Sequence, residues 1–264
     1  MRSSHPGRMW RFAAALAFTA TTFACDDSDD YGNEPEDPAP EATVVSATGD
    51  VTAKVTEFRA LLGDANGGTP GEQPAGRREI GWDGANANPF NNRNDFPATF
   101  FNTSATLGAV FATNGSGLRN DSTNFREIDD SYAEQFNFFS PTKIFSPIGS
   151  TQLDVLFLVA GAPTPAVVTG FGAIFSDVDR ATSTKFEAFD EDGRSLGVFS
   201  VPARSDAGGL SFVGVKFDDA IIARVRITLG EAPLAAGVRD VSAGGSADLV
   251  VVDNFIYGEP HAIQ

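Results

Sequence analysis

Oxygen-bearing side chains gather at the ends of two apolar runs in the second half of the chain. Asp177 and Asp179 come directly after the run GFGAIFS, and Asp253 and Asn254 interrupt the last run, VVVDNFIY. Alternate residues of a strand point to one face, so Asp177 and Asp179 can leave a sheet together. Calcium takes about six to eight oxygen ligands from carboxylates, carbonyls and water. We therefore expect Asp177, Asp179, Asp253 and Asn254 to bind calcium; the alternative is that each ends a strand or caps a turn.

A second group of candidate residues surrounds Trp82, the only tryptophan after the first 24 residues. Arg77 and Arg78 precede it and Asp83 follows it. An exposed indole ring can stack on a sugar while charged neighbours bind the hydroxyl groups. This pattern predicts a carbohydrate site formed by Arg77, Arg78, Trp82 and Asp83. The alternative is a core tryptophan whose N–H donates to a carbonyl, and the exposure of the ring distinguishes the two.

The scarcity of histidine and cysteine limits the chemistry of the chain. The two histidines are His5 and His261, and the one cysteine is Cys25. Residues 43–258 therefore lack Ser-His and Cys-His nucleophiles. They also lack the nitrogen and sulfur ligands of zinc. A non-catalytic protein is favoured, and the remaining enzymatic alternative is a carbohydrate-active enzyme with a carboxylate pair. The net charge of −16 argues against nucleic acid as a partner.

The first 42 residues have the composition of an export signal and a tether. Arg2, Arg8 and Arg11 precede an uncharged, mostly apolar run at 12–24. This run is too short to span a bilayer, so residues 1–24 are predicted to be a secretory signal. Cys25 follows at once, which is typical of a bacterial lipoprotein; ordinary cleavage is the alternative. The acidic, proline-rich residues 25–42 read as a disordered tether. The protein is thus expected in the cell envelope or outside the cell, touching a membrane only through a lipid on Cys25.

Residues 43–258 are expected to form one all-β domain, an antiparallel β-sandwich of jelly-roll type, followed by a tail at 259–264. In residues 221–229 apolar and polar side chains alternate, with Arg224, Arg226 and Thr228 on the polar side, which indicates a half-buried strand. Residues 51–62 fit either a strand or a helix. The other strands are predicted at 96–101, 107–113, 153–159, 168–175, 184–189, 195–201, 210–217 and 248–257.

Three segments resemble motifs of an uncharacterised group of secreted bacterial proteins, many of which end in a PEP-CTERM sorting tail. GRREIGWDG at 76–84 is similar to their GRREI-x-WDG, and GFGAIFSDVD at 170–179 to their GFGAVF-x-DVD. VVVDNFIYGEP at 250–260 is similar to their VV-x-DDFIYGEP ending, with Asn254 in place of Asp. This chain has a lipoprotein-like start and no such tail. The resemblance implies export and a β-rich fold, and it implies no activity.

Three functions follow as expectations from these features. The first is a lipid-anchored surface module that binds carbohydrate of an envelope or matrix. The second is a structural or adhesive surface protein without a small-molecule site, and the third is the carboxylate-pair enzyme. The sequence does not decide the ligand or the oligomeric state.

Overall fold

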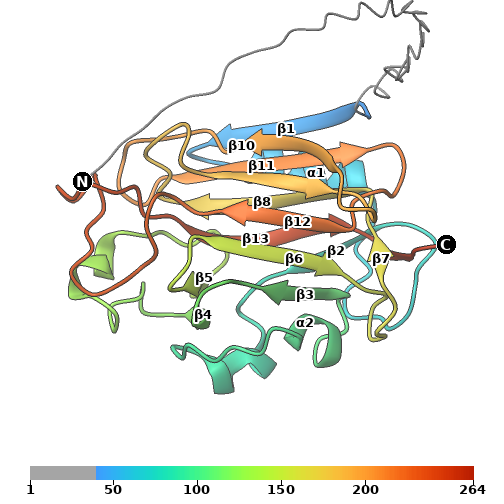
Figure 1. Ribbon diagram of the computed structural model, residues 1–264, viewed down its shortest axis with the longest axis horizontal. Coiled ribbons are helices and arrows are strands. Elements are labelled where there is room, and N and C mark those ends of the chain that lie inside the picture. Colours follow the sequence, from blue (N-terminus) through green and yellow to red (C-terminus); the bar gives the residue numbers. More distant parts are fainter. Residues whose placement is uncertain (1–39) are drawn as a thin grey trace, which may run out of the picture. The chain divides into compact units, whose positions relative to one another are not determined.

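Two antiparallel sheets pack face to face in the computed structural model, which describes residues 40–264 (Figure 1). The larger sheet has seven strands in the order β1-β11-β8-β13-β5-β4, with β2 paired to β13. The smaller sheet has five strands in the order β10-β9-β12-β6-β3, and β7 and β14 form a separate two-stranded ladder. The predicted all-β antiparallel sandwich is therefore confirmed.

The strand boundaries agree with the prediction in the second half of the chain. The larger sheet contains β1 (Ala42–Thr48), β2 (Arg77–Ile80), β4 (Gly117–Asp121), β5 (Ile144–Ile148), β8 (Gly170–Ser176), β11 (Leu210–Phe217) and β13 (Val251–Gly258). The smaller sheet contains β3 (Ala109–Ala112), β6 (Gln152–Phe157), β9 (Lys185–Phe189), β10 (Ser195–Ser200) and β12 (Arg224–Thr228). The short ladder joins β7 (Ala166–Val167) and β14 (His261–Ala262).

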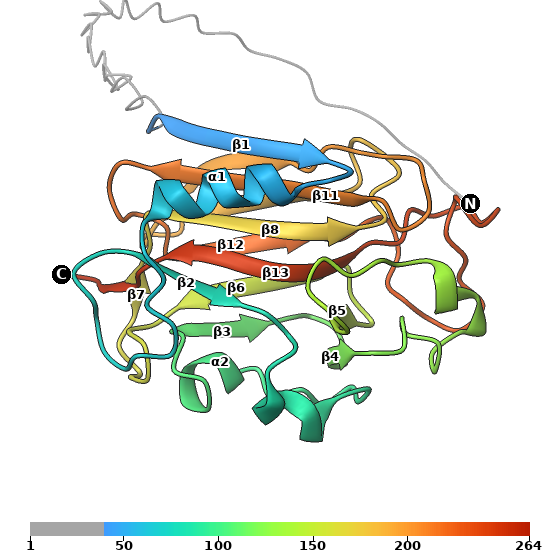
Figure 2. The ribbon, with the colours of Figure 1, turned by 180° about the vertical axis from the view of Figure 1, so that it is seen from behind.

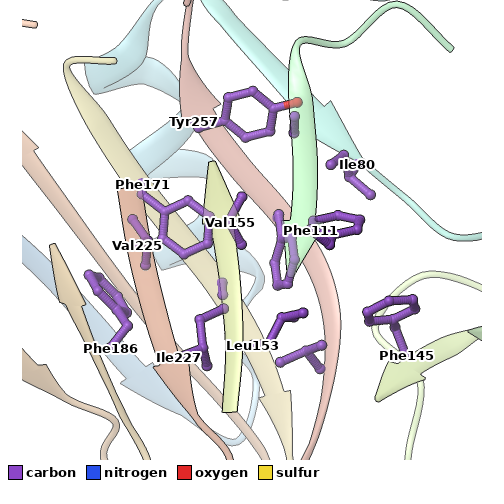
Figure 3. Close-up of a cluster of buried hydrophobic side chains, with 14 of the residues drawn as sticks. Ile80, Phe111, Phe145, Leu153, Val155, Phe171, Phe186, Val225, Ile227 and Tyr257 are labelled. Atoms are coloured by element: carbon purple, nitrogen blue, oxygen red, sulfur yellow. The ribbon is translucent and has the colours of Figure 1, made fainter. Parts of the chain in front are cut away.

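The main hydrophobic core lies between the two sheets (Figure 3). Val225 and Ile227 of β12 are fully buried, while Arg224 and Arg226 remain partly exposed, as the alternation predicts. Phe171 of β8 meets the edge of Phe186 of β9, with ring centroids 5.4 Å apart. Apolar side chains from both sheets thus interdigitate, which is the arrangement that stabilises a sandwich.

Helix α1 (Thr52–Leu62) covers the outer face of the larger sheet (Figure 2). Val55, Phe58 and Leu62 recur at helical spacing and are buried in a second core, which resolves the ambiguity of residues 51–62 in favour of a helix. Glycines make room for the helix, because a Cβ atom on Gly172 would lie 2.7 Å from the Phe58 ring and one on Gly214 would lie 2.8 Å from it.

The strand predicted at 96–101 is wrong. Its last two residues begin a short helix, α2 (Phe100–Thr103), and the preceding residues cross the end of the sandwich as a loop. Pro97 lacks an amide hydrogen and so cannot donate to a neighbouring strand. Phe96, Phe100 and Phe101 all point into the main core, which an alternating strand would not allow.

Two 3-10 helices, Ala85–Phe90 and Asp130–Glu134, complete the regular elements of the described residues. Among residues 40–264, no helix has both the length and the apolar character that crossing a membrane requires.

Candidate metal centre

Three aspartates from two separate segments meet at one end of the larger sheet. Asp177 and Asp179 follow β8, and Asp240 belongs to the loop between β12 and β13. One carboxylate oxygen from each residue lies within 4.8 Å of the corresponding oxygens of the other two. This Asp177–Asp179–Asp240 cluster can hold a metal ion.

Asp177 is the fully buried member of the cluster. Its two oxygens accept hydrogen bonds from the Gly208 amide, at 2.8 Å, and from the side-chain amide of Gln135. Burial nevertheless dominates and raises the pKa of Asp177 to about 7, with the Asp240 charge adding to the effect. The Gln135 amide also donates to Ser242 at 2.8 Å, which ties the Asp240 loop to the same point.

Asp179 is the unsatisfied member. Both of its carboxylate oxygens are buried and find no hydrogen-bond partner among the described residues. Burial, followed by the proximity of Asp240 and then Asp248, raises the pKa of Asp179 to about 7. A buried carboxylate without donors is costly and normally finds a partner. A bound cation, or a proton shared with Asp240, would compensate the Asp179 carboxylate.

Asp240 and Asp248 hold the shape of the site. Asp240 accepts from the amides of Ser242, at 2.6 Å, and Leu249, at 2.7 Å. Asp248 accepts from the amides of Asp179, at 3.2 Å, and Arg180, at 2.9 Å. These backbone bonds position the Asp179 turn and the Asp240 loop against each other, so the carboxylates are gathered by the fold itself.

Asp177 and Asp179 lie together as predicted, but Asp253 and Asn254 are not part of the cluster. The register pairs Val251 of β13 with Ser176 of β8, so Asp253 lies farther inside the sheet than Asp177, in a bulge between Val252 and Phe255. Asn254 is almost fully buried, and its amide oxygen has no partner among the described residues. The prediction that these two residues complete the site is wrong, and Asp240 takes the third position.

Asp253 forms a second, separate carboxylate pair with Asp83. It accepts from the amides of Phe139, at 2.7 Å, and Ser140, at 3.3 Å. The Ser140 hydroxyl lies 2.9 Å from an oxygen of Asp253 and 2.9 Å from an oxygen of Asp83. Burial raises the pKa of Asp253 to about 6, and the Asp83 charge contributes. The Ser140 hydroxyl has one hydrogen and can donate to only one of the two carboxylates. The other contact becomes a hydrogen bond when that carboxyl group carries a proton and donates it to the Ser140 oxygen.

Trp82 has no exposed surface. Its ring stacks on Phe145 with centroids 4.0 Å apart, and its N–H donates to the Asp253 carbonyl at 2.8 Å. Stacking on a sugar needs an open ring face. The predicted carbohydrate platform at Trp82 is therefore wrong, and the alternative of a core tryptophan holds. Asp83 is half-buried and accepts from Ser140 and, at 2.7 Å, from Thr142.

The two predicted ligand-binding arginines have structural partners. Arg78 is buried and makes a two-point ion pair with Glu259, with contacts of 2.7 and 2.6 Å. It also donates to the carbonyls of Gly67, Thr69, Gly71 and Thr106, which anchors the 63–76 loop. Arg77 pairs with Glu79 at 2.8 Å. The GRREI and YGEP segments thus meet in one buried ion pair, which leaves Arg78 no exposed surface for a sugar, whereas Arg77 is partly exposed.

The 76–84 segment reaches solvent at a cleft of about 300 Å³ beside α2. Glu79, Gly81 and Gly84 line one part of the cleft, and Phe100 and Phe101 line another. Its walls are mainly apolar, and the Glu79 carboxylate is already held by Arg59 and Arg77. The cleft therefore presents no free pair of carboxylates for acid–base chemistry.

The predicted lipidation residue Cys25, and with it the signal and most of the tether, lies outside the described residues. Comparison with known proteins finds no match to this chain among family models, curated proteins or solved structures.

Proposed function

We propose that this chain is an exported, non-catalytic surface module whose β-sandwich is completed by a calcium ion at the Asp177–Asp179–Asp240 cluster. The observation that carries the proposal is the Asp179 carboxylate, which lies beside two further aspartates and whose two buried oxygens have no hydrogen-bond partner within residues 40–264. Three carboxylates that repel one another destabilise an empty site, and the same three stabilise a divalent cation.

The donor set favours calcium over the other common protein metals. All three side chains offer oxygen, and no histidine or cysteine lies in the cluster, which argues against zinc and copper. Calcium accepts irregular oxygen cages completed by carbonyls and water, whereas magnesium demands a near-ideal octahedron. Sites in extracellular modules bind calcium at about 10⁻⁴–10⁻³ M, so a partly hydrated site of this kind is sufficient outside the cell.

The ion would act as a structural clamp. It would join the turn after β8 to the loop before β13, and Gln135 would attach the segment after the second 3-10 helix to the same point. A structural or adhesive surface role fits this arrangement better than sugar binding at Trp82, because that ring is enclosed by the core. Export through residues 1–24 and a lipid on Cys25 rest on the sequence alone, and mass spectrometry of the membrane fraction tests them.

Thermal unfolding of the chain in calcium and in chelator tests the clamp. At a calcium concentration about 100-fold above the dissociation constant, binding adds about 2.7 kcal/mol to the free energy of unfolding. The midpoint should rise in calcium for the wild type and stay constant for Asp179→Asn and Asp240→Asn. Asp192→Asn, on the exposed β9–β10 turn, is the matched control and should respond like the wild type. Equal wild-type midpoints in calcium and chelator would refute the proposal.

A further inference from the structure

Thr142, in the loop that leads into β5, has a backbone conformation that its side chain normally forbids. Its φ is 91°. Positive φ is uncommon outside glycine, and for a β-branched residue it is a genuine outlier. The Cβ atom of an L-residue comes closest to the preceding carbonyl carbon at a φ of about 120°. The Thr142 side chain is therefore turned toward the carbonyl carbon of Pro141.

The Thr142 hydroxyl group is hydrogen-bonded to a carboxylate. Its Oγ1 donates to Oδ1 of Asp83 at 2.7 Å. A threonine hydroxyl becomes a nucleophile when a base within hydrogen-bond reach takes its proton, and a carboxylate can be that base. Attack on the Pro141 carbonyl closes a small ring of Oγ1, Cβ, Cα, N and the carbonyl carbon. This ring closes only when Cβ and that carbon lie on the same side of the N–Cα bond, as the positive φ places them.

The neighbours of Thr142 hold it in this conformation. On one side, the Phe139 amide donates to the Asp253 carboxylate at 2.7 Å. On the other side, the ammonium group of the buried Lys143 donates to Asn88 at 2.6 Å, and β5 begins at the next residue. Because both flanks are fixed, the loop cannot relax the strain. Strained backbone that is held in this way clusters at functional sites.

We propose that the chain cleaves its own peptide bond between Pro141 and Thr142, by an acyl shift from nitrogen to oxygen that hydrolysis completes. Asp83 takes the Oγ1 proton as Oγ1 bonds to the Pro141 carbonyl carbon. The bond from that carbon to the Thr142 nitrogen then breaks, and Asp83 returns the proton to the nitrogen, which becomes an amine. An ester now joins the two parts. Water hydrolyses the ester, leaving a carboxylate on Pro141 and restoring the Thr142 hydroxyl.

A second threonine shows which features are specific to Thr142. Thr106 also has a positive φ, but its value of 46° lies close to the ordinary left-handed region. Its hydroxyl donates to the Gly68 carbonyl, which is not a base that can take the proton. Pro141 and Thr142 are also exposed, so water can reach the ester. Strain, hydroxyl, carboxylate and solvent thus meet at Thr142 and not at Thr106.

The cleaved chain should keep its fold. The break lies between β4 and β5, and strands from its two sides pair with one another, β1 with β11, β2 with β13, β3 with β6 and β4 with β5 (Figure 1). The two fragments should therefore stay together in the native protein and separate only in denaturant. The cleavage goes beyond the proposed surface role and needs no calcium.

Intact-mass spectrometry of the full chain, denatured after incubation at neutral pH with protease inhibitors, tests the proposal. We expect one fragment that ends at Pro141 and one that begins at Thr142. Hydroxylamine attacks esters, so it should speed the cleavage and leave a hydroxamate on Pro141, which a contaminating protease would not do. A chain that keeps its full mass both with and without hydroxylamine overturns the proposal.

Variants identify the groups that act. Thr142→Val keeps the shape of the side chain without the hydroxyl and should stay intact, whereas Thr142→Ser should cleave. Asp83→Asn should cleave about 100-fold more slowly, which is the usual contribution of a general base. Thr106→Val is the matched control and should cleave like the parent. Circular dichroism identifies the variants that fold. Cleavage of a folded Thr142→Val or Asp83→Asn chain at the rate of the parent overturns the proposal.

Discussion

If the proposed calcium site exists, protons and calcium should compete for the same carboxylates at the Asp177–Asp179–Asp240 cluster. The pKa values of Asp177 and Asp179 are both raised, chiefly by burial, from the ordinary aspartate value of 3.8 to about 7. A raised carboxyl pKa in the folded state means that the folded protein holds a proton that the unfolded chain has lost. Without calcium, this contribution to stability is therefore fully present below about pH 4 and is lost as the pH rises to about 7.

The size of this pH effect on stability follows from Asp177, which is completely buried. A shift of about three pKa units at Asp177 corresponds to about 4 kcal/mol, at about 1.4 kcal/mol per unit. Calcium should reverse the trend, because binding needs the carboxylates ionised and releases their protons. Apparent affinity should therefore weaken about tenfold for each pH unit below 7 for every proton released.

The assay is the difference between the unfolding midpoints in calcium and in chelator, measured at intervals from pH 5 to pH 8. We expect the difference to be small at pH 5 and to grow until about pH 7, where it levels off. Taking the difference at each pH cancels the titration of every other group in the protein. The Asp179→Asn variant should show no difference at any pH. A calcium effect that is constant from pH 5 to pH 8 would refute the reasoning.

Three further predictions concern the buried groups. Arg78→Met should lower the free energy of unfolding by about 3–5 kcal/mol in urea titrations, because Glu259 is left buried and unpaired; adding Glu259→Gln should restore part of the loss. Fluorescence of Trp82 should be blue-shifted and unchanged by polysaccharides, because the ring is enclosed. The wild type should lose about 3 kcal/mol of stability as the pH rises from about 4 to about 6, because Asp253 loses its proton over this range. The Asp253→Asn variant should not show this loss, because its amide can donate to Ser140 at every pH.

Each of these has a clear contrary result. An Arg78→Met chain as stable as the wild type would mean that Glu259 finds another donor. Quenching of Trp82 by a sugar would mean that the ring opens to solvent. An Asp253→Asn variant with the same stability profile as the wild type between pH 4 and pH 6 would mean that Asp253 is ionised throughout that range.

Local sequence pattern was sufficient for much of the second half of the fold. The strands from β8 to β13 alternate or form apolar runs bounded by turn residues, and this pattern is set by which side chains must avoid water. Asp177 and Asp179 do lie together as the sequence suggested, but the reason differs: Asp177 has φ 72 in the turn after β8, so the turn and not an extended strand brings the two carboxylates together.

The third aspartate of the cluster and the burial of Trp82 depend on contacts between segments far apart in the sequence. Asp240 lies 61 positions after Asp179 in a loop without a metal-binding pattern, and hydrogen bonds such as those of Gln135 with Ser242 and of Asp248 with the Asp179 amide bring that loop to the site. Trp82 is flanked by charged residues as a surface residue would be, yet Phe145 and the β13 backbone enclose it.

The short strands in the first half of the chain were decided in the same way. Residues 77–80 contain two arginines and a glutamate, and residues 117–121 contain arginine, asparagine and aspartate. These segments become β2 and β4 because neighbouring strands supply partners for their backbone groups, and because buried carboxylates pair with Arg78 and Arg119. Local sequence determines which apolar side chains are buried. The pairing of distant strands determines which polar residues are buried beside these apolar side chains, because the hydrogen bonds that compensate a buried polar residue exist only in the folded chain.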